Sequence, residues 1–212
     1  MGRRNYLIAG VSCSGKTSVF SELRRRGHHA VNGDTDLAYQ GDPTTGIAMT
    51  STGMRASHWH HIWNVNAVRA LAGDCIRPAT FFCGGSRNLA EFVDLFDAVF
   101  VLRIDLVTLR RRLDQRPESE FGGIRHERDL IVRIHQGDDA VPTDPVPADA
   151  IDIDATVPIG DVVDEILRQL GSPHRRSSCA DARRHREVTT GVGVVERAAR
   201  SGLFAYTGAG AT

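Results

Sequence analysis

Apolar runs of about five residues recur along the chain, and between them apolar positions follow the spacing of a helix. Two of the runs, ATFFC and AVFVL, are almost continuously apolar, as strands buried on both faces of a sheet are. The runs predict five strands, at residues 6–10, 29–33, 79–83, 98–102 and 150–154. Because strands alternate with helices, the sequence predicts an α/β fold in three layers, with helices on both faces of a five-stranded parallel sheet.

Two segments show the helical period most clearly. Apolar residues from Leu89 to Phe96 repeat at i, i+3, i+4 and i+7, which predicts an amphipathic helix over residues 89–96. Residues 159–170 follow the same period for three turns, and Pro158 stands where a proline suits the opening of a helix.

The periodic pattern stops at Gly171. Residues 171–212 are rich in Gly, Ala, Ser, Thr and Arg, and their seven arginines against three acidic residues give a net charge of +4. We expect one domain over residues 1–170, followed by an arginine-rich flexible tail over residues 171–212. A loosely docked helix around residues 191–200 is the alternative for this tail.

Composition is typical of a water-soluble globular protein: of 212 residues, 41% are hydrophobic and 25% are charged, and the formal net charge is zero. A zero net charge gives no global field that would attract nucleic acid or an acidic membrane surface, so we expect neither as a partner. The four cysteines form no C-x-x-C pair, which argues against a disulfide framework and favours a cytoplasmic location. No stretch approaches the roughly 20 apolar residues of a membrane span.

The segment GVSCSGKT, residues 10–17, fits the pattern G-x-x-x-x-G-K-[ST] and follows the first predicted strand, where this pattern forms a phosphate-binding loop. Gly10 and Gly15 let the backbone curl so that successive N–H groups face an anion. Lys16, the only lysine of the chain, would reach the β- and γ-phosphates, and Thr17 would offer a hydroxyl to Mg²⁺. We therefore expect ATP and Mg²⁺ as ligands. The residues predicted to bind the nucleotide are Gly10, Val11, Ser12, Cys13, Ser14, Gly15, Lys16, Thr17 and Ser18.

Three further motifs follow predicted strands: NGDTD at residues 32–36, CGGSRN at 83–88 and LRRRLDQRPESEFGG at 109–123. Together with the phosphate-binding loop they resemble the small-molecule kinases of the nucleoside monophosphate kinase superfamily, above all the shikimate and gluconate kinase branch. The resemblance covers about residues 5–170. It implies a P-loop NTPase fold and transfer of a phosphoryl group from ATP to a small molecule.

In the first motif the resemblance implies two acidic roles. In shikimate kinases a D-x-D pair follows the second strand, with one carboxylate near the metal and the attacking hydroxyl and the other on the substrate. This carries over to Asp34 as a catalytic and metal-binding residue and to Asp36 as a substrate-binding residue. The plainer alternative is a turn, because Asn-Gly-Asp-Thr-Asp also suits one.

The second motif resembles the glycine cluster whose backbone approaches substrate and γ-phosphate in these kinases. It implies substrate contacts for Gly84, Gly85 and Arg87, although Ser86 stands where shikimate kinases usually have a third glycine. Most P-loop NTPases end this strand with an aspartate for the metal. Its absence here argues against a motor ATPase or a GTPase.

The third motif resembles the lid of these kinases, an L-x-x-R-x-x-x-R helix that brings arginines over the nucleotide, and predicts a lid over about residues 110–128. Because Arg112 and Arg116 are four residues apart, we expect them on one face of a helix. By the resemblance Arg112 would stack on adenine. Arg116 would reach the phosphates as a catalytic residue, where positive charge stabilises the transition state. A solvated basic helix is the alternative, and it is what we expect of Arg110 and Arg111.

Residues 37–75 form the expected substrate region, where Trp59, Trp63 and three histidines gather near Arg55. An arginine in this region grips the substrate carboxylate in shikimate kinases, which makes Arg55 a candidate. The aromatic and imidazole side chains suit a flat ring such as a nucleobase, with Trp59 as a binding residue. The alternatives are that Trp59 and Trp63 belong to the core and, less favoured, that the histidines bind zinc.

The sequence thus predicts an ATP-dependent kinase, an enzyme that phosphorylates a small hydroxylated metabolite. A nucleoside or nucleotide is the leading acceptor, and a shikimate-like or sugar acid is the second. A regulatory module that binds ATP without transferring phosphate is a rival from another class. A polynucleotide 5′-kinase with the tail as a phosphate clamp is less favoured, because the tail lacks interleaved aromatic residues. The sequence indicates no particular oligomeric state.

Overall fold

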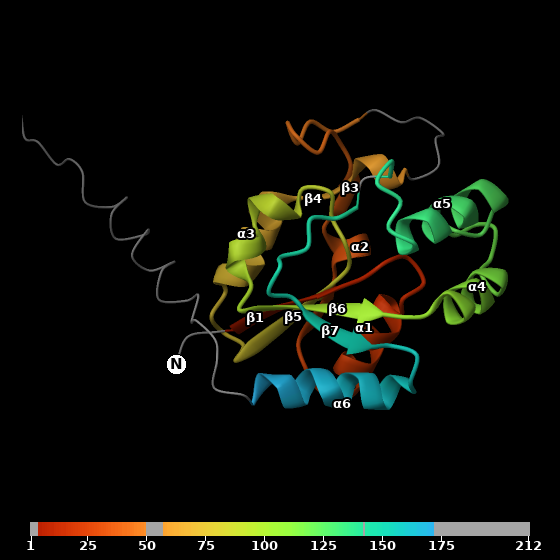
Figure 1. Ribbon diagram of the computed structural model, residues 1–212. Helices are drawn as coiled ribbons and strands as arrows, with labels where there is room; N and C mark the ends of the chain where they lie inside the picture. Colours follow the sequence, from red (N-terminus) through yellow and green to blue (C-terminus); the bar gives the residue numbers. More distant parts are fainter. Residues whose placement is uncertain (1–3, 50–56, 142, 172–212) are drawn as a thin grey trace, which may run out of the picture.

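Five parallel strands form the centre of the protein in its computed structural model, which describes residues 4–49, 57–141 and 143–171 (Figure 1). The strands are β1 (Arg4–Ala9), β2 (Ala30–Asn32), β5 (Ala79–Cys83), β6 (Ala98–Arg103) and β7 (Ile151–Asp154). Their order across the sheet is β2-β5-β1-β6-β7, and every neighbouring pair is parallel. All five predicted strands and the parallel sheet are confirmed. The tail predicted from the sequence lies, beyond Gly171, outside the described residues.

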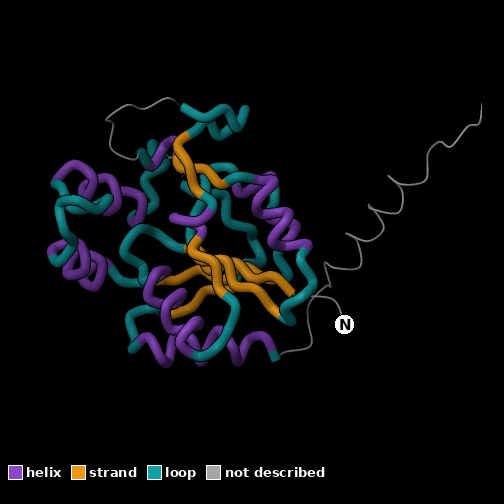
Figure 2. The backbone as a smooth tube through the Cα atoms, turned by 180° about the vertical axis from the view of Figure 1, so that it is seen from behind, coloured by secondary structure: helices purple, strands orange, loops and turns teal. Residues whose placement is uncertain are grey.

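Helices cover both faces of the sheet, which confirms the predicted three layers. α1 (Lys16–Arg25) and α6 (Ile159–Leu170) lie side by side on one face, and α3 (Val65–Gly73) lies on the opposite face (Figures 1 and 2). α4 (Leu106–Asp114) and α5 (Arg125–His135) extend beyond the carboxyl ends of the strands. Among the helices of the described ranges, none has both the length and the apolar character that crossing a membrane requires.

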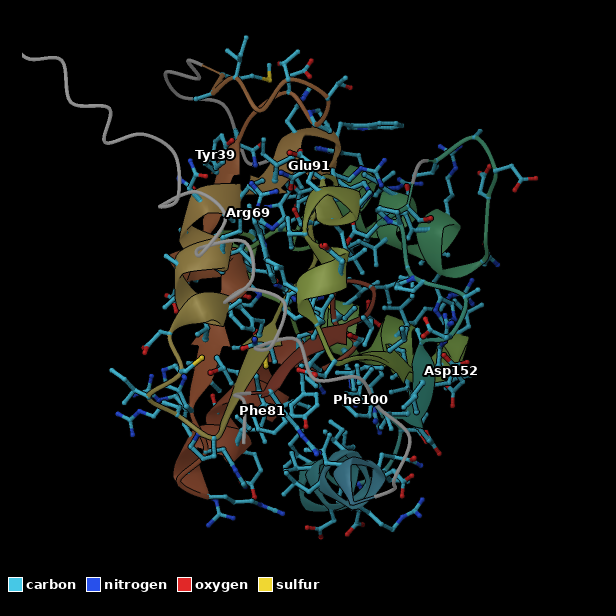
Figure 3. The ribbon with its side chains drawn as sticks, turned by 90° about the vertical axis from the view of Figure 1, so that its left-hand side faces the viewer. Tyr39, Arg69, Phe81, Glu91, Phe100 and Asp152 are labelled. Atoms are coloured by element: carbon cyan, nitrogen blue, oxygen red, sulfur yellow. The ribbon has the colours of Figure 1, made fainter. Side chains whose placement is uncertain are left out.

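The alternation of side chains along each strand builds a hydrophobic core on each face of the sheet. Along β1, Tyr6 and Ile8 point into the core shared with α1 and α6, whereas Leu7 points into the core on the other face. Phe81 of β5 and Phe100 of β6 lie in the core on the face of the sheet that α1 and α6 cover (Figure 3). Because both faces are buried, β5 and β6 are apolar at nearly every position.

The helix predicted over residues 159–170 is confirmed as α6, but the helix predicted over residues 89–96 is wrong. That segment forms two 3₁₀ turns, η2 (Leu89–Glu91) and η3 (Val93–Leu95). Between them Phe92 has a φ of −148°, which interrupts any helix. Its ring stacks on Trp63 with centroids 5.8 Å apart, so packing against another element decides the local structure.

A small antiparallel ribbon, which the sequence did not predict, lies beside the carboxyl ends of β2 and β5. Its parts in chain order are α2 (Gly33–Asp36), β3 (Ala38–Gln40), η1 (His58–His60) and β4 (His61–Trp63). Trp63 anchors the ribbon, because its side chain is fully buried and its backbone N–H and C=O both pair with the Asn88 side chain at 3.1 Å. The ribbon therefore holds Asp34 and His61 in defined positions.

The order of the strands places a crevice at the carboxyl ends of the central ones. From β1 the chain continues to β2 at one edge of the sheet, and from the adjacent β6 it continues to β7 at the other edge. Connections that leave neighbouring strands in opposite directions open the crevice in which α/β folds bind ligands. The phosphate-binding loop and the three further motifs follow β1, β2, β5 and β6, so all four meet at this edge.

Candidate active site

The loop after β1 has the backbone geometry of an anion-binding nest. Gly10 and Gly15 have φ values of +145° and +113°, and Cys13 between them has a φ of +66°. A Cβ at Gly10 would lie 2.6 Å from Ser14 Oγ, so only glycine fits there. α1 begins at Lys16 and adds the positive end of its dipole. The loop therefore suits a phosphate chain.

The side chain of Lys16 folds over this loop. Its Nζ donates to the carbonyls of Gly10 at 2.8 Å and Val11 at 3.1 Å, so the ammonium lies where a bound phosphate chain would need it. Thr17 is exposed on the first turn of α1. Its hydroxyl and the carboxylate of Asp34 are oxygen ligands of the kind that Mg²⁺ prefers, so the donor set fits the predicted metal.

Asp34, in α2, is tied to two other elements. The N–H of Gly85 donates to Asp34 Oδ1 at 3.0 Å, and His61 Nε2 lies 3.2 Å from the same oxygen. Partial burial raises the pKa of Asp34, but the hydrogen bond with His61 and the charge of Lys16 lower it further than burial raises it. The Gly85 N–H adds to this effect, so the pKa of Asp34 lies below its ordinary value. Asp34 is therefore ionised at neutral pH.

Gly84 and Gly85 bring the loop after β5 close to this carboxylate. A Cβ at Gly84 would lie 2.5 Å from Asp34 Oδ1 and equally close to the Trp63 ring. A Cβ at Gly85 would collide with the carboxylate of Asp144. Residues without a side chain are needed here because two acidic side chains and an indole ring pack against the backbone.

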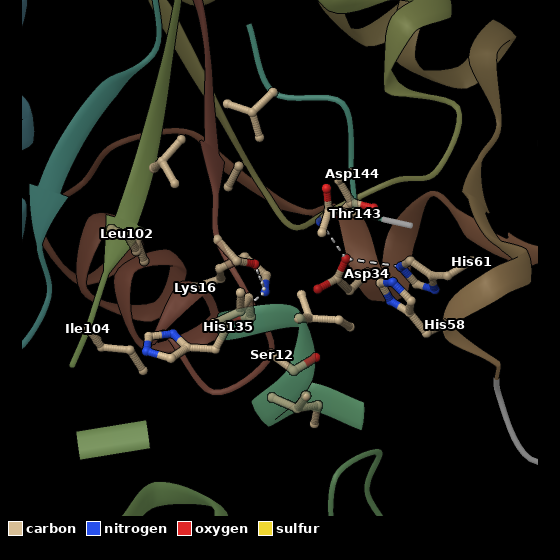
Figure 4. Close-up of a pocket in the computed structure, with 18 of the residues that line it drawn as sticks. Ser12, Lys16, Asp34, His58, His61, Leu102, Ile104, His135, Thr143 and Asp144 are labelled. Carbon is tan, nitrogen blue, oxygen red and sulfur yellow. Dashed lines mark hydrogen bonds and ion pairs between the residues drawn. The ribbon is translucent and has the colours of Figure 1, made fainter. Parts of the chain in front are cut away.

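The loop, Asp34 and Gly85 open into one cavity of about 800 Å³. In Figure 4, Asp34 lies between Lys16 on one side and His58 and His61 on the other, with Asp144 close by. We call this part the ribbon end of the cavity; its lining residues are Asp34, Ser57, His58, His61, Gly85, Thr143 and Asp144. The opposite part, the α5 end, is lined by Leu102, Ile104, Phe121, Ile131, Ile134 and His135.

The predicted nucleotide-binding residues divide into two groups around this cavity. Those that line it are Gly10, Val11, Ser12 and Lys16, and Arg116 of the predicted lid lines it too. Those that do not line it are Cys13, Ser14, Gly15, Thr17, Ser18 and Arg112. The first group lines the cavity directly. The second group forms the rest of the nest and the first turn of α1, where Thr17 is exposed, and includes Arg112 of α4.

Arg112 and Arg116 both reach the phosphate-binding loop. Arg112 Nη1 donates to the carbonyls of Cys13 at 3.1 Å and Ser14 at 2.8 Å, and its Nη2 donates to the carbonyl of Ala155 at 2.8 Å. Arg116 Nη1 lies 2.9 Å from Cys13 Sγ. Arg112 thus ties the loop to α4 and to the segment after β7, while Arg116 reaches the cavity wall.

The two arginines do not share one helix, which corrects the expectation from their spacing. α4 ends at Asp114, and Arg116 follows the last turn. A proline disfavours the helical conformation of the residue before it. Arg116 directly precedes Pro117, so it does not continue α4. Arg116 reaches the loop from the segment that leaves α4.

Asp36 does not reach the cavity. Its Oδ2 accepts a hydrogen bond from the backbone N–H of Asn32 at 3.1 Å, and its Oδ1 accepts one from Thr35 Oγ1 at 2.9 Å. The carboxylate therefore closes the turn of α2, which agrees with the alternative that NGDTD forms a turn. Its substrate-binding role stays a prediction.

The two tryptophans of the substrate region have different surroundings. Trp63 is fully buried in the core, whereas Trp59 is 42% exposed and does not line the cavity. The core alternative is thus confirmed for Trp63 only. Arg55 lies outside the described residues. Among the residues that the structure describes, the ribbon end therefore has no tryptophan on which a nucleobase could stack.

Several lining residues were not predicted individually from the sequence. His61 and His58 belong to the noted histidine cluster, but their spacing gave no sign that one of them pairs with Asp34. Asp144 and His135 lie in segments that carry no motif. Only the fold brings the segment after α5 across the sheet to Gly85, so no local pattern could have found Asp144.

Comparison with known proteins assigns this chain to a family. A family model described as an AAA domain matches residues 7–132, more than half of the chain. A search of curated proteins gave no significant match. Solved structures similar to this chain include a sugar kinase from Janibacter sp. (17% identity, covering 79% of this chain and 94% of that one, TM-score 0.45). A gluconokinase from Sinorhizobium meliloti is also similar (15% identity, covering 88% of this chain and 97% of that one, TM-score 0.44). So is a shikimate kinase from Aquifex aeolicus (18% identity, covering 78% of this chain and 95% of that one, TM-score 0.39). Likenesses this low say nothing of activity.

Proposed function

We propose that this chain, which belongs to the AAA domain family, is an ATP-dependent phosphotransferase, a kinase that moves the γ-phosphate of ATP to a hydroxyl group of a small molecule. The observation that carries the proposal is that the carboxyl group of Asp34 lines the same cavity as Lys16 of the phosphate-binding loop. Transfer to a hydroxyl needs a group that accepts its proton, and Asp34 can serve as that base.

The cavity offers a place for each reactant. The phosphate chain of ATP would bind at the nest and Lys16. The α5 end, with three isoleucines and Phe121, suits the apolar faces of an adenine ring. The ribbon end, which holds Asp34, is left for the acceptor. The order along the cavity is then adenine, phosphate chain and acceptor hydroxyl, with Asp34 beside the acceptor, as a direct transfer requires.

In the proposed reaction the acceptor oxygen attacks the γ-phosphorus, and the bond from that phosphorus to the β–γ bridging oxygen breaks. ADP leaves with the electron pair of that bond, and Asp34 accepts the proton of the acceptor hydroxyl. Lys16 and Arg116 stabilise the negative charge that spreads over the transferring oxygens. Mg²⁺, held by Thr17 and Asp34, would add further neutralisation of that charge.

The main rival is a regulatory module that binds ATP without transferring phosphate. Such a module needs the nest and Lys16 to bind ATP, but it does not need a carboxylate and further polar side chains at the ribbon end of the cavity. Asp34, His58, His61 and Asp144 therefore favour the kinase.

The experiment measures ADP formed by the full chain with ATP and Mg²⁺, with and without a mixture of small hydroxylated metabolites. We expect ADP formation to depend on the mixture, and Lys16→Ala to abolish it. Arg110→Ala, an exposed residue of α4, is the matched control and should keep wild-type rates. ATP binding without acceptor-dependent ADP would support the regulatory module instead.

A further inference from the structure

The ribbon end of the cavity carries a second carboxylate, Asp144, which takes no part in the phosphoryl transfer step itself. Asp144 follows α5 and lies against Gly85, so close that a Cβ on that glycine would collide with it. Asp34 Oδ1 accepts from the N–H of the same glycine at 3.0 Å. Both acidic side chains therefore reach the ribbon end beside one residue of the loop after β5 (Figure 4).

Asp144 has its own counter-ion behind the cavity wall. Arg87 Nη1 lies 3.8 Å from Asp144 Oδ1, and the Arg87 side chain is only 13% exposed. The Arg87 backbone N–H donates to the carbonyl of His61 at 3.0 Å, which fixes this arginine to the ribbon. Within the described residues, Arg87 Nε and Nη1 are buried and make no hydrogen bond. Arg87 itself does not line the cavity, so a ligand meets Asp144 and not the guanidinium.

The cations that do line the described part of the cavity belong to its other regions. Lys16 bonds the carbonyls of the phosphate-binding loop, Arg116 contacts Cys13 of that loop, and Arg103 pairs with Asp152 of β7 at 2.8 Å. Among the residues that the structure describes, a ligand at the ribbon end therefore meets two carboxylates, two imidazoles and the hydroxyls of Ser57 and Thr143. A carboxylate only accepts hydrogen bonds, so it binds hydroxyl groups well and repels carboxylate or phosphate groups.

From this arrangement we infer that Asp144, held by Arg87, is a specificity-determining residue, and that the acceptor is a neutral polyhydroxylated compound such as a sugar or a nucleoside. Asp144 accepts a hydrogen bond from a hydroxyl other than the one that is phosphorylated, and it repels the corresponding acids. The inference rests on the proposed function. Of the acceptors predicted from the sequence, it favours nucleosides and disfavours nucleotides and shikimate-like or sugar acids, and it adds neutral sugars.

The same geometry predicts the effect of removing the charge. In Asp144→Asn the amide keeps the shape but no longer offsets Arg87, whose guanidinium then contributes an unbalanced positive charge at the ribbon end. A neutral acceptor loses a charged hydrogen bond, and an acidic acceptor gains an attraction. Preference between the two should therefore shift toward the acid. Asp149→Asn is the matched control, because Asp149 is exposed in the same segment and does not line the cavity.

The test compares matched pairs of acceptors with the full chain: glucose with gluconate, ribose with ribonate, and adenosine with AMP. For the pair that is phosphorylated, we expect kcat/KM at least about tenfold higher for the neutral member, because the carboxylates of the ribbon end repel the negative charge of the acid. Asp144→Asn should lower kcat/KM for the neutral member by about tenfold or more. It should also reduce the ratio of kcat/KM between the neutral and the acidic member. Asp149→Asn should change neither value.

A binding measurement separates failure of this inference from failure of the proposed function. In the presence of a non-hydrolysable ATP analogue, neutral members should raise the melting temperature of the wild type more than their acids do, whether or not phosphate is transferred. No phospho-product despite such binding would overturn the kinase and keep the inference. A preference for the acids, equal effects of Asp144→Asn and Asp149→Asn, or no stabilisation by any neutral member would overturn the inference.

Discussion

Asp34 shows how three residues far apart in the sequence make one reactive group. His61 comes from the ribbon, Gly85 from the loop after β5 and Lys16 from the start of α1, and each lowers the pKa of the same carboxyl group. Because the pKa is held below its ordinary value, the carboxylate stays ionised as the pH falls toward the ordinary range of an aspartate. The three contacts therefore stabilise the ionised form of the carboxyl group, which is the form that can accept a proton or bind a metal ion.

Replacing Asp34 should separate chemistry from binding. Asp34→Asn keeps the shape of the side chain and removes its charge, so ATP affinity should stay within a few fold of the wild type. With an acceptor that the wild type phosphorylates, kcat should fall by roughly 10² to 10⁴, the usual range for losing a positioned base. The measurements are steady-state kinetics and titration with an ATP analogue. A variant with wild-type kcat would mean that NGDTD is only a turn.

Asp36 provides the matched control two residues away. Its carboxylate bonds the backbone of Asn32 and the Thr35 hydroxyl instead of facing the cavity, so Asp36→Asn should leave kcat close to that of the wild type. The role predicted for Asp36 from the sequence would show itself as a raised KM for the acceptor with kcat unchanged.

At the scale of elements, α4 acts through arginines whose roles differ. Arg112→Ala removes three hydrogen bonds to the carbonyls of Cys13, Ser14 and Ala155. Hydrogen bonds from a charged donor to such groups matter to stability, so we expect the free energy of unfolding to fall by about 2 kcal/mol. Chemical denaturation measures it. Arg110→Ala, on the exposed face of the same helix, should stay within about 0.5 kcal/mol of the wild type.

Arg116 should affect the rate instead of the fold. It lines the cavity at the phosphate-binding loop, so Arg116→Ala should slow turnover by roughly 10³-fold or more if its charge acts on the transferring phosphate. Acceptor-dependent ADP formation measures the effect, with Arg110→Ala again as control. Equal effects of the two substitutions would contradict the role proposed for Arg116.

Strands and helices whose buried positions follow a regular spacing could be predicted from the sequence. Elements whose structure depends on contacts with distant segments could not. β5 and β6 are apolar on both faces because helices cover both, so their runs identify them as strands. Residues 89–96 have a helical spacing but are too closely tied to Trp63 and the sheet to form a helix. The ribbon of β3 and β4 depends on the pairing of strands three residues long, which leaves almost no local pattern.

At the scale of the whole molecule, the order of the strands decides which residues meet. The backbone nest of the phosphate-binding loop could be predicted, because one segment carries it. The contact of Asp34 with His61 and the approach of Asp144 to Gly85 could not, because they join segments that only the sheet brings together. A site made by one segment can therefore be predicted from this sequence, whereas the residues that surround the proposed acceptor are known only from the fold.

Removal of residues 175–212 tests where the domain ends. Within residues 4–49, 57–141 and 143–171, the buried side chains that form the two cores on the sheet come from residues between Tyr6 and Ile166, and residues 175–212 show no apolar periodicity in the sequence. We therefore expect the shortened chain to keep its melting temperature and its stabilisation by an ATP analogue, both followed by thermal shift. A shortened chain that is insoluble, or that melts well below the full chain, would show that the removed residues pack on the domain.

The fate of the γ-phosphate tests the central claim most directly. The full chain is incubated with Mg²⁺, ATP labelled in its γ-phosphate and the neutral acceptors glucose, ribose and adenosine, and the labelled products are separated and identified by mass. The account predicts that the label moves to a hydroxyl of an acceptor, and that Asp34→Asn keeps ATP binding but loses this transfer. Label found only in inorganic phosphate, or label that stays in ATP although ATP binds, would contradict it.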